Sequence, residues 1–388
     1  MERKINRNIL CCFALLLIST LVAFQKAENK KYFRSPTILV KYDRIDAHFV
    51  AFGDSTSNDT LYQVWSKDNY PVAYFREIKT GVCFDNKCRQ LDVVLYWNIT
   101  GRYLGFELPQ GEYLSKTDHE PFTEQEYEQL SDILADKRSP LANFTYNQVV
   151  QEPVSKLAGL DGITSATSPA VLEHVVPGAA YTTYKLWHLV YGSAQAEVMR
   201  FTRMALSPEL MLQILNSPDE SDVMWALHHI KGYVPLSPKL SNKILGFINT
   251  ENYSLSERAI YALDPVELTS DSLQFHLLQK FYESDYSIKK LIIDKLKEAP
   301  ELNSRVKEKL AGNLAQLNGE IISRVLEVFK RHKLTDVEAY RKVAELLQDE
   351  NDFISKKAFD FLRHEQVKEE GIQKQLKEYG LKHDVSLN

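Results

Sequence analysis

A 33-residue spacing of apolar residues runs through the second half of the chain and constrains its fold more than any other feature. Residues three or four positions apart lie on one face of a helix, so each repeat predicts two helices. One such pair cannot bury its apolar face alone, but stacked pairs can, so we expect an α-solenoid of about five pairs over residues 206–380. The four series are Met211, Ile244, Leu277, Leu310 and Val343; Leu215, Ile248, Phe281, Leu314 and Leu347; Leu227, Ile260, Ile293, Leu326 and Phe359; and Ile230, Leu263, Leu296, Phe329 and Leu362.

This repeat resembles the HEAT-repeat class of α-solenoids. Asparagine and aspartate residues precede the second helix of each unit, where they suit turns and N-caps; they are Asp219, Asn252, Asp285, Asn318 and Asp352. The resemblance implies an architecture and a concave surface that binds another protein, and it implies no catalytic residue.

The first 27 residues are typical of an export signal. Arg3, Lys4 and Arg7 precede an uncharged apolar run from Ile9 to Phe24. This run is shorter than the roughly 20 residues that span a bilayer comfortably. We therefore expect a cleavable signal peptide, with an uncleaved N-terminal anchor as the alternative and the only means of membrane attachment. The rest of the chain is then exported to the periplasm or the outer face of the membrane.

Charge and motif content exclude several functional classes. The 388 residues include 47 Lys and Arg against 52 Asp and Glu, a net charge of -5. Nucleic-acid binding needs a basic surplus, so we expect no nucleic-acid partner. The sequence contains no nucleophile-elbow, zinc-protease, P-loop or dinucleotide-binding motif, so hydrolase and nucleotide-binding functions lack support. We expect no metal site and no substrate-converting catalytic residue.

Cys83 and Cys88 are the only cysteines outside the export segment. They flank Asp85-Asn86, which favours a turn, so we expect a short-loop disulfide in an oxidising compartment. A metal site would need further ligands, which no second cysteine pair or nearby histidine supplies. A redox-active dithiol remains an alternative, although its usual spacing is Cys-x-x-Cys.

We expect residues 30–198 to form an α+β domain ahead of the solenoid. Val93–Trp97 and Tyr103–Leu108 are rich in β-branched and aromatic residues and are joined by an Asn/Gly turn, which predicts a hairpin. Thr123 and Glu126 form a capping-box pattern that predicts a helix ending near Ala135.

The end of this domain contains a small-residue loop that leads into a helix. Ser168 suits an N-cap and Pro169 the first helical turn, and a helix N-terminus favours a phosphate. Thr167 adds a hydroxyl at this point. The following segment, residues 181–188, is aromatic and could form one wall of a ligand site. His174 and His188 lie near this loop, where either could tune a bound ligand; a hydrogen-bonded, partly buried histidine is the alternative for both.

Asp161-Gly162-Ile163-Thr164-Ser165-Ala166-Thr167 resembles the flavinylation motif of FMN-binding domains, Asp-x-x-(Ser/Thr)-Gly-Ala-Thr. Such domains occur in periplasmic subunits of sodium-pumping NADH:quinone reductase and Rnf-type complexes. The resemblance covers roughly residues 75–195. It implies that a flavin transferase joins FMN through its phosphate to Thr167. Asp161, Thr164 and Ala166 match the motif, whereas Ser165 stands where glycine is usual.

These features together predict an exported electron-transfer flavoprotein module. Its cofactor would be FMN, covalently bound to Thr167 within the site Asp161, Thr164, Ser165, Ala166, Thr167 and Ser168. Its partners would be a flavin transferase and a redox protein docked on the HEAT-like solenoid. The alternative is a non-enzymatic interaction protein, in which the solenoid acts as a scaffold and the first domain is structural or binds a ligand.

Overall fold

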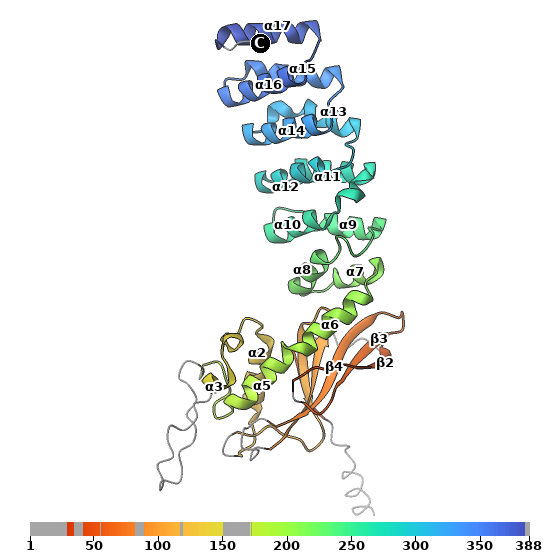
Figure 1. The fold of residues 1–388 in the computed structure, drawn as a ribbon, viewed down its shortest axis with the longest axis vertical. Coiled ribbons are helices and arrows are strands. Elements are labelled where there is room, and N and C mark those ends of the chain that lie inside the picture. The colour runs from red at the N-terminus through yellow and green to blue at the C-terminus, as the bar shows by residue number, and fades with distance from the viewer. Residues whose placement is uncertain are drawn as a thin grey trace, which may run out of the picture. The chain divides into compact units, whose positions relative to one another are not determined.

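The chain forms two compact units, Met1–Ala205 and Leu206–Asn388, and each is described by itself. The computed structural model describes residues 29–34, 42–54, 56–81, 89–116, 119–149, 171 and 173–384. The first unit contains an antiparallel sheet with helices, and the second is helical (Figure 1). This confirms the expected order of an α+β part followed by an all-α part.

Among the described residues the sheet has six strands in the order β1-β6-β5-β4-β3-β2, so β1 and β2 lie at opposite edges. Each neighbouring pair is antiparallel. Side chains alternate between the faces, as they do in any strand: in β5 the residues at 91, 93, 95 and 97 are buried. The strands are β1 (Lys30–Phe33), β2 (Tyr42–Phe49), β3 (Thr60–Ser66), β4 (Pro71–Thr80), β5 (Leu91–Asn98) and β6 (Tyr103–Leu108).

The predicted hairpin is confirmed as β5 and β6. Its turn is closed by Asn98, whose side-chain Oδ1 accepts hydrogen bonds from the Thr100 and Arg102 amides at 3.0 and 2.8 Å. Gly101 has φ +82°, a conformation that glycine adopts without steric cost. The turn residues therefore fix the register of β5 and β6.

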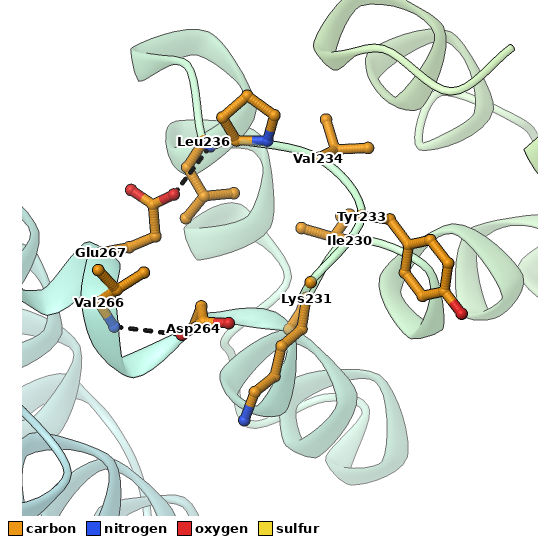
Figure 2. Close-up of a pocket in the computed structure, with 11 residues that line it drawn as sticks. Ile230, Lys231, Tyr233, Val234, Leu236, Asp264, Val266 and Glu267 are labelled. Carbon is orange, nitrogen blue, oxygen red and sulfur yellow. Dashed lines mark hydrogen bonds between the residues drawn. The ribbon is translucent and has the colours of Figure 1, made fainter. Parts of the chain in front are cut away.

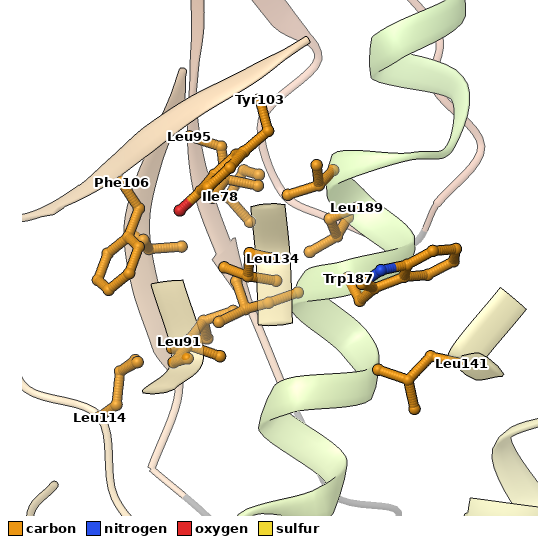
Figure 3. Packing of buried hydrophobic residues seen from close by; sticks show 14 of the residues in the cluster. Ile78, Leu91, Leu95, Tyr103, Phe106, Leu114, Leu134, Leu141, Trp187 and Leu189 are labelled. Carbon is orange, nitrogen blue, oxygen red and sulfur yellow. The ribbon is translucent and has the colours of Figure 1, made fainter. Parts of the chain in front are cut away.

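Helices cover one face of the sheet and close its core (Figure 3). The predicted capping box at Thr123 and Glu126 is present, and the helix that follows it ends at Ala135. Two buried indoles join layers through hydrogen bonds: Trp97 donates to the Val190 carbonyl at 2.9 Å, and Trp187 donates to the Asp136 carbonyl at 3.0 Å. The elements are α2 (Glu124–Ala135), η3 (Pro140–Asn143), α3 (Tyr146–Val149), α5 (Ala180–Val190) and α6 (Ser193–Met204).

The second unit consists of short helices that stack in successive pairs (Figure 1). They are α7 (Pro208–Ile214), α8 (Glu220–His228), α9 (Pro238–Gly246), α10 (Tyr253–Ala262), η4 (Pro265–Thr269), α11 (Asp271–Glu283), α12 (Tyr286–Lys297), α13 (Ser304–Gly312), η5 (Leu314–Gln316), α14 (Gly319–Arg331), α15 (Val337–Glu345), η6 (Leu346–Gln348), α16 (Asp352–His364) and α17 (Glu370–Lys382).

Every residue of the four 33-residue series is buried, with at most 7% of its surface exposed. The N-caps follow the same spacing: Asp219, Asn252, Asp285 and Asn318 each accept a backbone N–H of the helix that they precede. The fifth cap is Asn351, whereas Asp352, which the sequence suggested, is the first helical residue. The cap therefore lies 33 residues after Asn318, in register with the other four.

Neighbouring pairs are tied together by polar contacts between their second helices. Arg324 of α14 binds Asp294 of α12 through two hydrogen bonds of 2.7 and 2.8 Å. Lys295 is buried, and its ammonium donates to the Leu263 carbonyl at the end of α10 at 3.2 Å. A lysine at a helix C-terminus satisfies a carbonyl and complements the helix dipole. These contacts fix how one pair lies on the next.

The end of the first unit differs in detail from the expected position at residue 198, which falls inside α6. Thr202 of α6 is fully buried and donates to the Tyr74 hydroxyl at 3.1 Å. Because α6 is bound to the sheet up to this residue, the first unit extends to Ala205.

The export segment, residues 1–27, and both Cys83 and Cys88 lie outside the described residues. In the part of the chain that the structure describes, no helix combines the length and apolar character needed to cross a membrane.

We expect Cys83 and Cys88 to be joined in protein isolated from the oxidising compartment. Their loop would link the end of β4 to the start of β5, two strands that already pair from Ala73 to Thr80. Because the strands hold the loop ends together, closing the disulfide costs little further chain entropy. Alkylation before and after reduction, followed by mass spectrometry, measures the pairing. Two thiols alkylated without reduction would contradict both the bridge and the export of this domain.

Candidate functional site

The expected flavin loop lies outside the described residues, with Asp161, Thr164, Ser165, Ala166, Thr167 and Ser168 all in the undescribed segment 150–170. The residues on either side of this segment are described. Val149, at the end of α3, and Val171 are both fully buried. They belong to one apolar cluster with the buried face of α5. Both borders of the segment are therefore fixed in the core of the first unit.

Helix α5 presents a half-buried polar and aromatic stripe. Tyr181, Tyr184, Lys185 and His188 are partly exposed and recur at a spacing of three or four residues, so they share one face of the helix. The opposite face contains Leu186 and Val190, which are fully buried. The stripe is the part of residues 181–188 that a bound molecule can reach.

Hydrogen bonds hold two residues of this stripe against the segment just before α3. The Tyr184 hydroxyl donates to the Phe144 carbonyl at 3.0 Å, and His188 Nε2 lies 3.2 Å from the Leu141 carbonyl. The two rings are 4.1 Å apart between centroids. Because a carbonyl only accepts, Nε2 of His188 carries a hydrogen, and the neutral ring keeps Nδ1 as an acceptor.

Burial lowers the pKa of His188 below its usual value, and the hydrogen bond to Leu141 opposes this shift only in part. The imidazole is therefore neutral at pH 7. His174, the other histidine noted in the sequence, lies in a turn in which its backbone N–H donates to the Val171 carbonyl at 2.9 Å. The imidazole of His174 is half-buried and lies shortly after the undescribed segment.

The lowered pKa of His188 predicts that acid destabilises the first unit. Below about pH 6.5 the His188 side chain is protonated in the unfolded chain, whereas in the folded chain it is protonated only at lower pH. The free energy of unfolding therefore falls as the pH drops through this value. Replacing His188 with glutamine should reduce this acid sensitivity. Thermal unfolding at pH 7.5 and 5.5 measures it, with the exposed His276→Gln as the control. An equal loss of melting temperature in all three proteins would contradict the prediction.

Lys185 connects α5 to a buried ion pair. Its ammonium donates to the Asp54 backbone carbonyl at 3.4 Å. The Asp54 side chain accepts hydrogen bonds from Arg76, one of them at 3.2 Å, and the Arg76 side chain has no exposed surface. Arg76 also donates to the Asn58 carbonyl at 2.8 Å and lies 3.6 Å from the centre of the Phe52 ring. These contacts hold Asp54 and Asn58 against Arg76 as one cluster, and Lys185 joins Asp54 to α5.

The charges of Arg76 and Asp54 compensate each other. Burial alone would raise the pKa of the Asp54 carboxyl, but hydrogen bonds from Arg76 and Thr56 outweigh it and hold the pKa below its usual value. Both groups are therefore charged and paired, which a buried arginine requires. The cluster is a structural support for α5 and not a free cation for a ligand.

Sequence reasoning missed Arg76, although the sequence contains a signal for it. In β4 the residues Tyr74, Arg76 and Ile78 share one face, because side chains alternate along a strand. Tyr74 and Ile78 are fully buried. A cation between two large core residues of one strand indicates a buried partner, and here that partner is Asp54.

One pocket of the described residues lies in the helical unit and is an unconvincing active site. It measures about 270 Å³ and is bordered by the loop between α8 and α9 and by η4 (Figure 2). Its two carboxylates are occupied: Glu267 accepts the Leu236 amide at 3.2 Å, and Asp264 accepts the Val266 amide at 3.2 Å. The Lys231 ammonium points away from Glu267 (Figure 2).

A second, water-sized cavity of about 10 Å³ lies at the start of α5 and is lined by Thr182, Ser115 and Arg89. Among the described residues, no three or more His, Cys, Asp or Glu side chains are grouped so that they could hold a metal ion. The α5 stripe beside the borders of the flavin segment is therefore the best-supported candidate site.

Comparison with known proteins assigns the chain to no family. No family model matches it, and no curated protein is significantly similar to it.

Proposed function

We propose that the chain is an exported electron-transfer flavoprotein, with FMN joined as a phosphoester to the Thr167 hydroxyl by a separate flavin transferase. The observation that carries this proposal is the Asp161–Thr167 sequence, which ends in a hydroxyl directly before Ser168-Pro169. When bound, FMN supplies one- and two-electron transfer, while the protein sets access and orientation. Covalent attachment would keep the cofactor with the protein outside the cytoplasm.

The described residues beside the segment suit this cofactor. The Tyr184 and His188 rings are half-buried and held by hydrogen bonds to backbone carbonyls. They are tilted by 47° to each other, so one ring could stack on a flavin while the other contacts its edge. The Asp54 carboxylate, whose backbone carbonyl binds Lys185 of α5, is paired with Arg76 and adds little repulsion toward an anionic phosphodiester. We assign Tyr184 and His188 as positioning residues.

We further propose that the helical unit is a HEAT-like solenoid that docks the redox partner. The burial of all four 33-residue series and the ties between neighbouring pairs support this architecture. The second helices also expose aromatic side chains, which are enriched in protein interfaces. These are Tyr253, Tyr261, Tyr286 and Phe353, with 46%, 49%, 41% and 49% of their surface exposed.

Co-expression with and without a flavin transferase tests the proposal. Protein made with the transferase should retain yellow absorbance and in-gel fluorescence after denaturation, and protein made without it should be colourless. Colourless protein under both conditions would contradict the flavoprotein assignment. It would favour the alternative, a non-enzymatic interaction protein built on the helical unit.

A further inference from the structure

Strand β2 has an open edge and an exposed apolar surface. It is the last strand of the sheet and pairs only with β3 among the described strands. Tyr42, Ile45 and Phe49 of this strand expose 60%, 43% and 83% of their surface. A strand edge with unpaired N–H and C=O groups is a template for another strand.

The ladder with β3 shows which backbone groups face outward. Val50 donates to the Asp59 carbonyl at 2.7 Å, and Phe49 lies opposite Thr60. In an antiparallel pair, alternate residues direct both backbone groups to the same neighbour. His48 and Asp46 therefore face β3, whereas the N–H and C=O groups of Ile45, Ala47 and Phe49 point to the open edge.

Two of the charges that usually protect an edge strand, Arg44 and Asp46, are paired with each other here, which leaves Asp43 at the start of β2 as its exposed charge. Arg44 Nε lies 3.2 Å from Asp46 Oδ1 on the same strand. The Arg44 guanidinium also lies 4.5 Å from the centre of the Trp65 ring. The two charges compensate each other and are directed along the sheet surface, so they repel an approaching strand only weakly.

We propose that β2 pairs with β2 of a second copy of this chain, antiparallel and centred on Ala47. A two-fold axis normal to the sheet brings residues of the same face opposite one another. Centring it on Arg44 or Asp46 would oppose like charges, which destabilises a strand pair. Centring it on Ala47 places Ile45 opposite Phe49, and Asp46 opposite His48, twice in each dimer. This register pairs the exposed apolar side chains better than one centred on Ile45.

The inference is independent of the flavin proposal, because it uses only residues of the sheet. Its test is cysteine trapping in the full chain. Residues opposite each other in a hydrogen-bonded antiparallel pair have Cα atoms about 5.5 Å apart, within the range of a disulfide. Under mild oxidation, Ala47→Cys should form a covalent dimer on a non-reducing gel, whereas Ile45→Cys and the unsubstituted chain should not. Cross-linking through Ile45→Cys but not Ala47→Cys would overturn the proposed register.

Sedimentation velocity over roughly 1 to 100 μM provides the second measurement. The unsubstituted chain should show a reversible monomer–dimer equilibrium. Phe49→Lys should raise the dimer dissociation constant at least about tenfold, because the apolar contact is lost twice in each dimer. Leu381→Lys is the matched control, since Leu381 exposes 86% of its surface in the other unit. A chain that stays monomeric throughout, or equal dissociation constants for Phe49→Lys and the control, would overturn the proposal.

Discussion

Thr167→Ala is expected to abolish covalent flavin while leaving the fold unchanged. The phosphoester is formed with the threonine oxygen, which the alanine side chain lacks. The loss of covalent flavin should therefore be complete and not graded. Intact-mass spectrometry of protein co-expressed with the transferase measures it. Because Val149 and Val171 hold the borders of the segment in the core, the melting temperature should change little.

Two neighbouring substitutions make this experiment specific. Ser168→Ala removes the adjacent hydroxyl but keeps Thr167, so the flavin should remain. Ser165→Gly restores the residue that is usual in the resembling motif, and flavinylation should be retained. An adduct on Thr167→Ala, or its loss in Ser168→Ala, would contradict the choice of Thr167 as the attachment residue.

The largest expected effect on stability is that of Asp54→Asn. Removing this charge leaves the Arg76 guanidinium buried without its counter-ion, which costs about 3 kcal/mol in the free energy of unfolding. Urea denaturation of the full chain in a Trp225→Phe background leaves the three tryptophans of the sheet unit, Trp65, Trp97 and Trp187, as the fluorescence probes and measures the loss in that unit.

The exposed pair Arg89–Glu112 provides the matched control. Its atoms are 2.6 Å apart, but 37% and 29% of the two side chains are exposed, so Glu112→Gln should change stability little. The Arg76→Met substitution should also lower the free energy of unfolding less in the Asp54→Asn variant than in the unsubstituted chain, because the ion pair is already broken in that variant. Equal effects of Asp54→Asn and Glu112→Gln would show that burial does not strengthen this ion pair.

Much of the fold follows from local and periodic signals in the sequence. The hairpin of β5 and β6 is specified by β-branched residues on both sides of an Asn/Gly turn, and the helix at Thr123 by its capping box. The helical unit is indicated by the 33-residue period, because a repeated structure repeats its core positions. The cap at Asn351 was missed by one residue, since Asp352 is an equally good N-cap when only residue type is considered.

The rest depends on contacts between distant residues. No local signal tells that β1 and β2 lie at opposite edges of one sheet, because their order results from pairing with β6 and β3. The length of α6 is also set at a distance, by the bond between Thr202 and Tyr74. At the candidate site, the sequence indicated the aromatic residues 181–188 but not the Arg76–Asp54 pair that supports them.

The attachment of α6 has a mechanical consequence. The chain leaves the sheet unit directly after this helix, at Ala205. Ala194, Val198 and Thr202 bury successive turns of the helix, and the Tyr74 hydroxyl that Thr202 binds is itself held by Gln63 of β3 at 2.9 Å. A pulling force that arrives through residue 205 therefore meets the Thr202 contact first, and then those of Val198 and Ala194 on the earlier turns. Each turn of α6 is a separate point of attachment to the sheet, which shields the strands from a load that the helical unit bears.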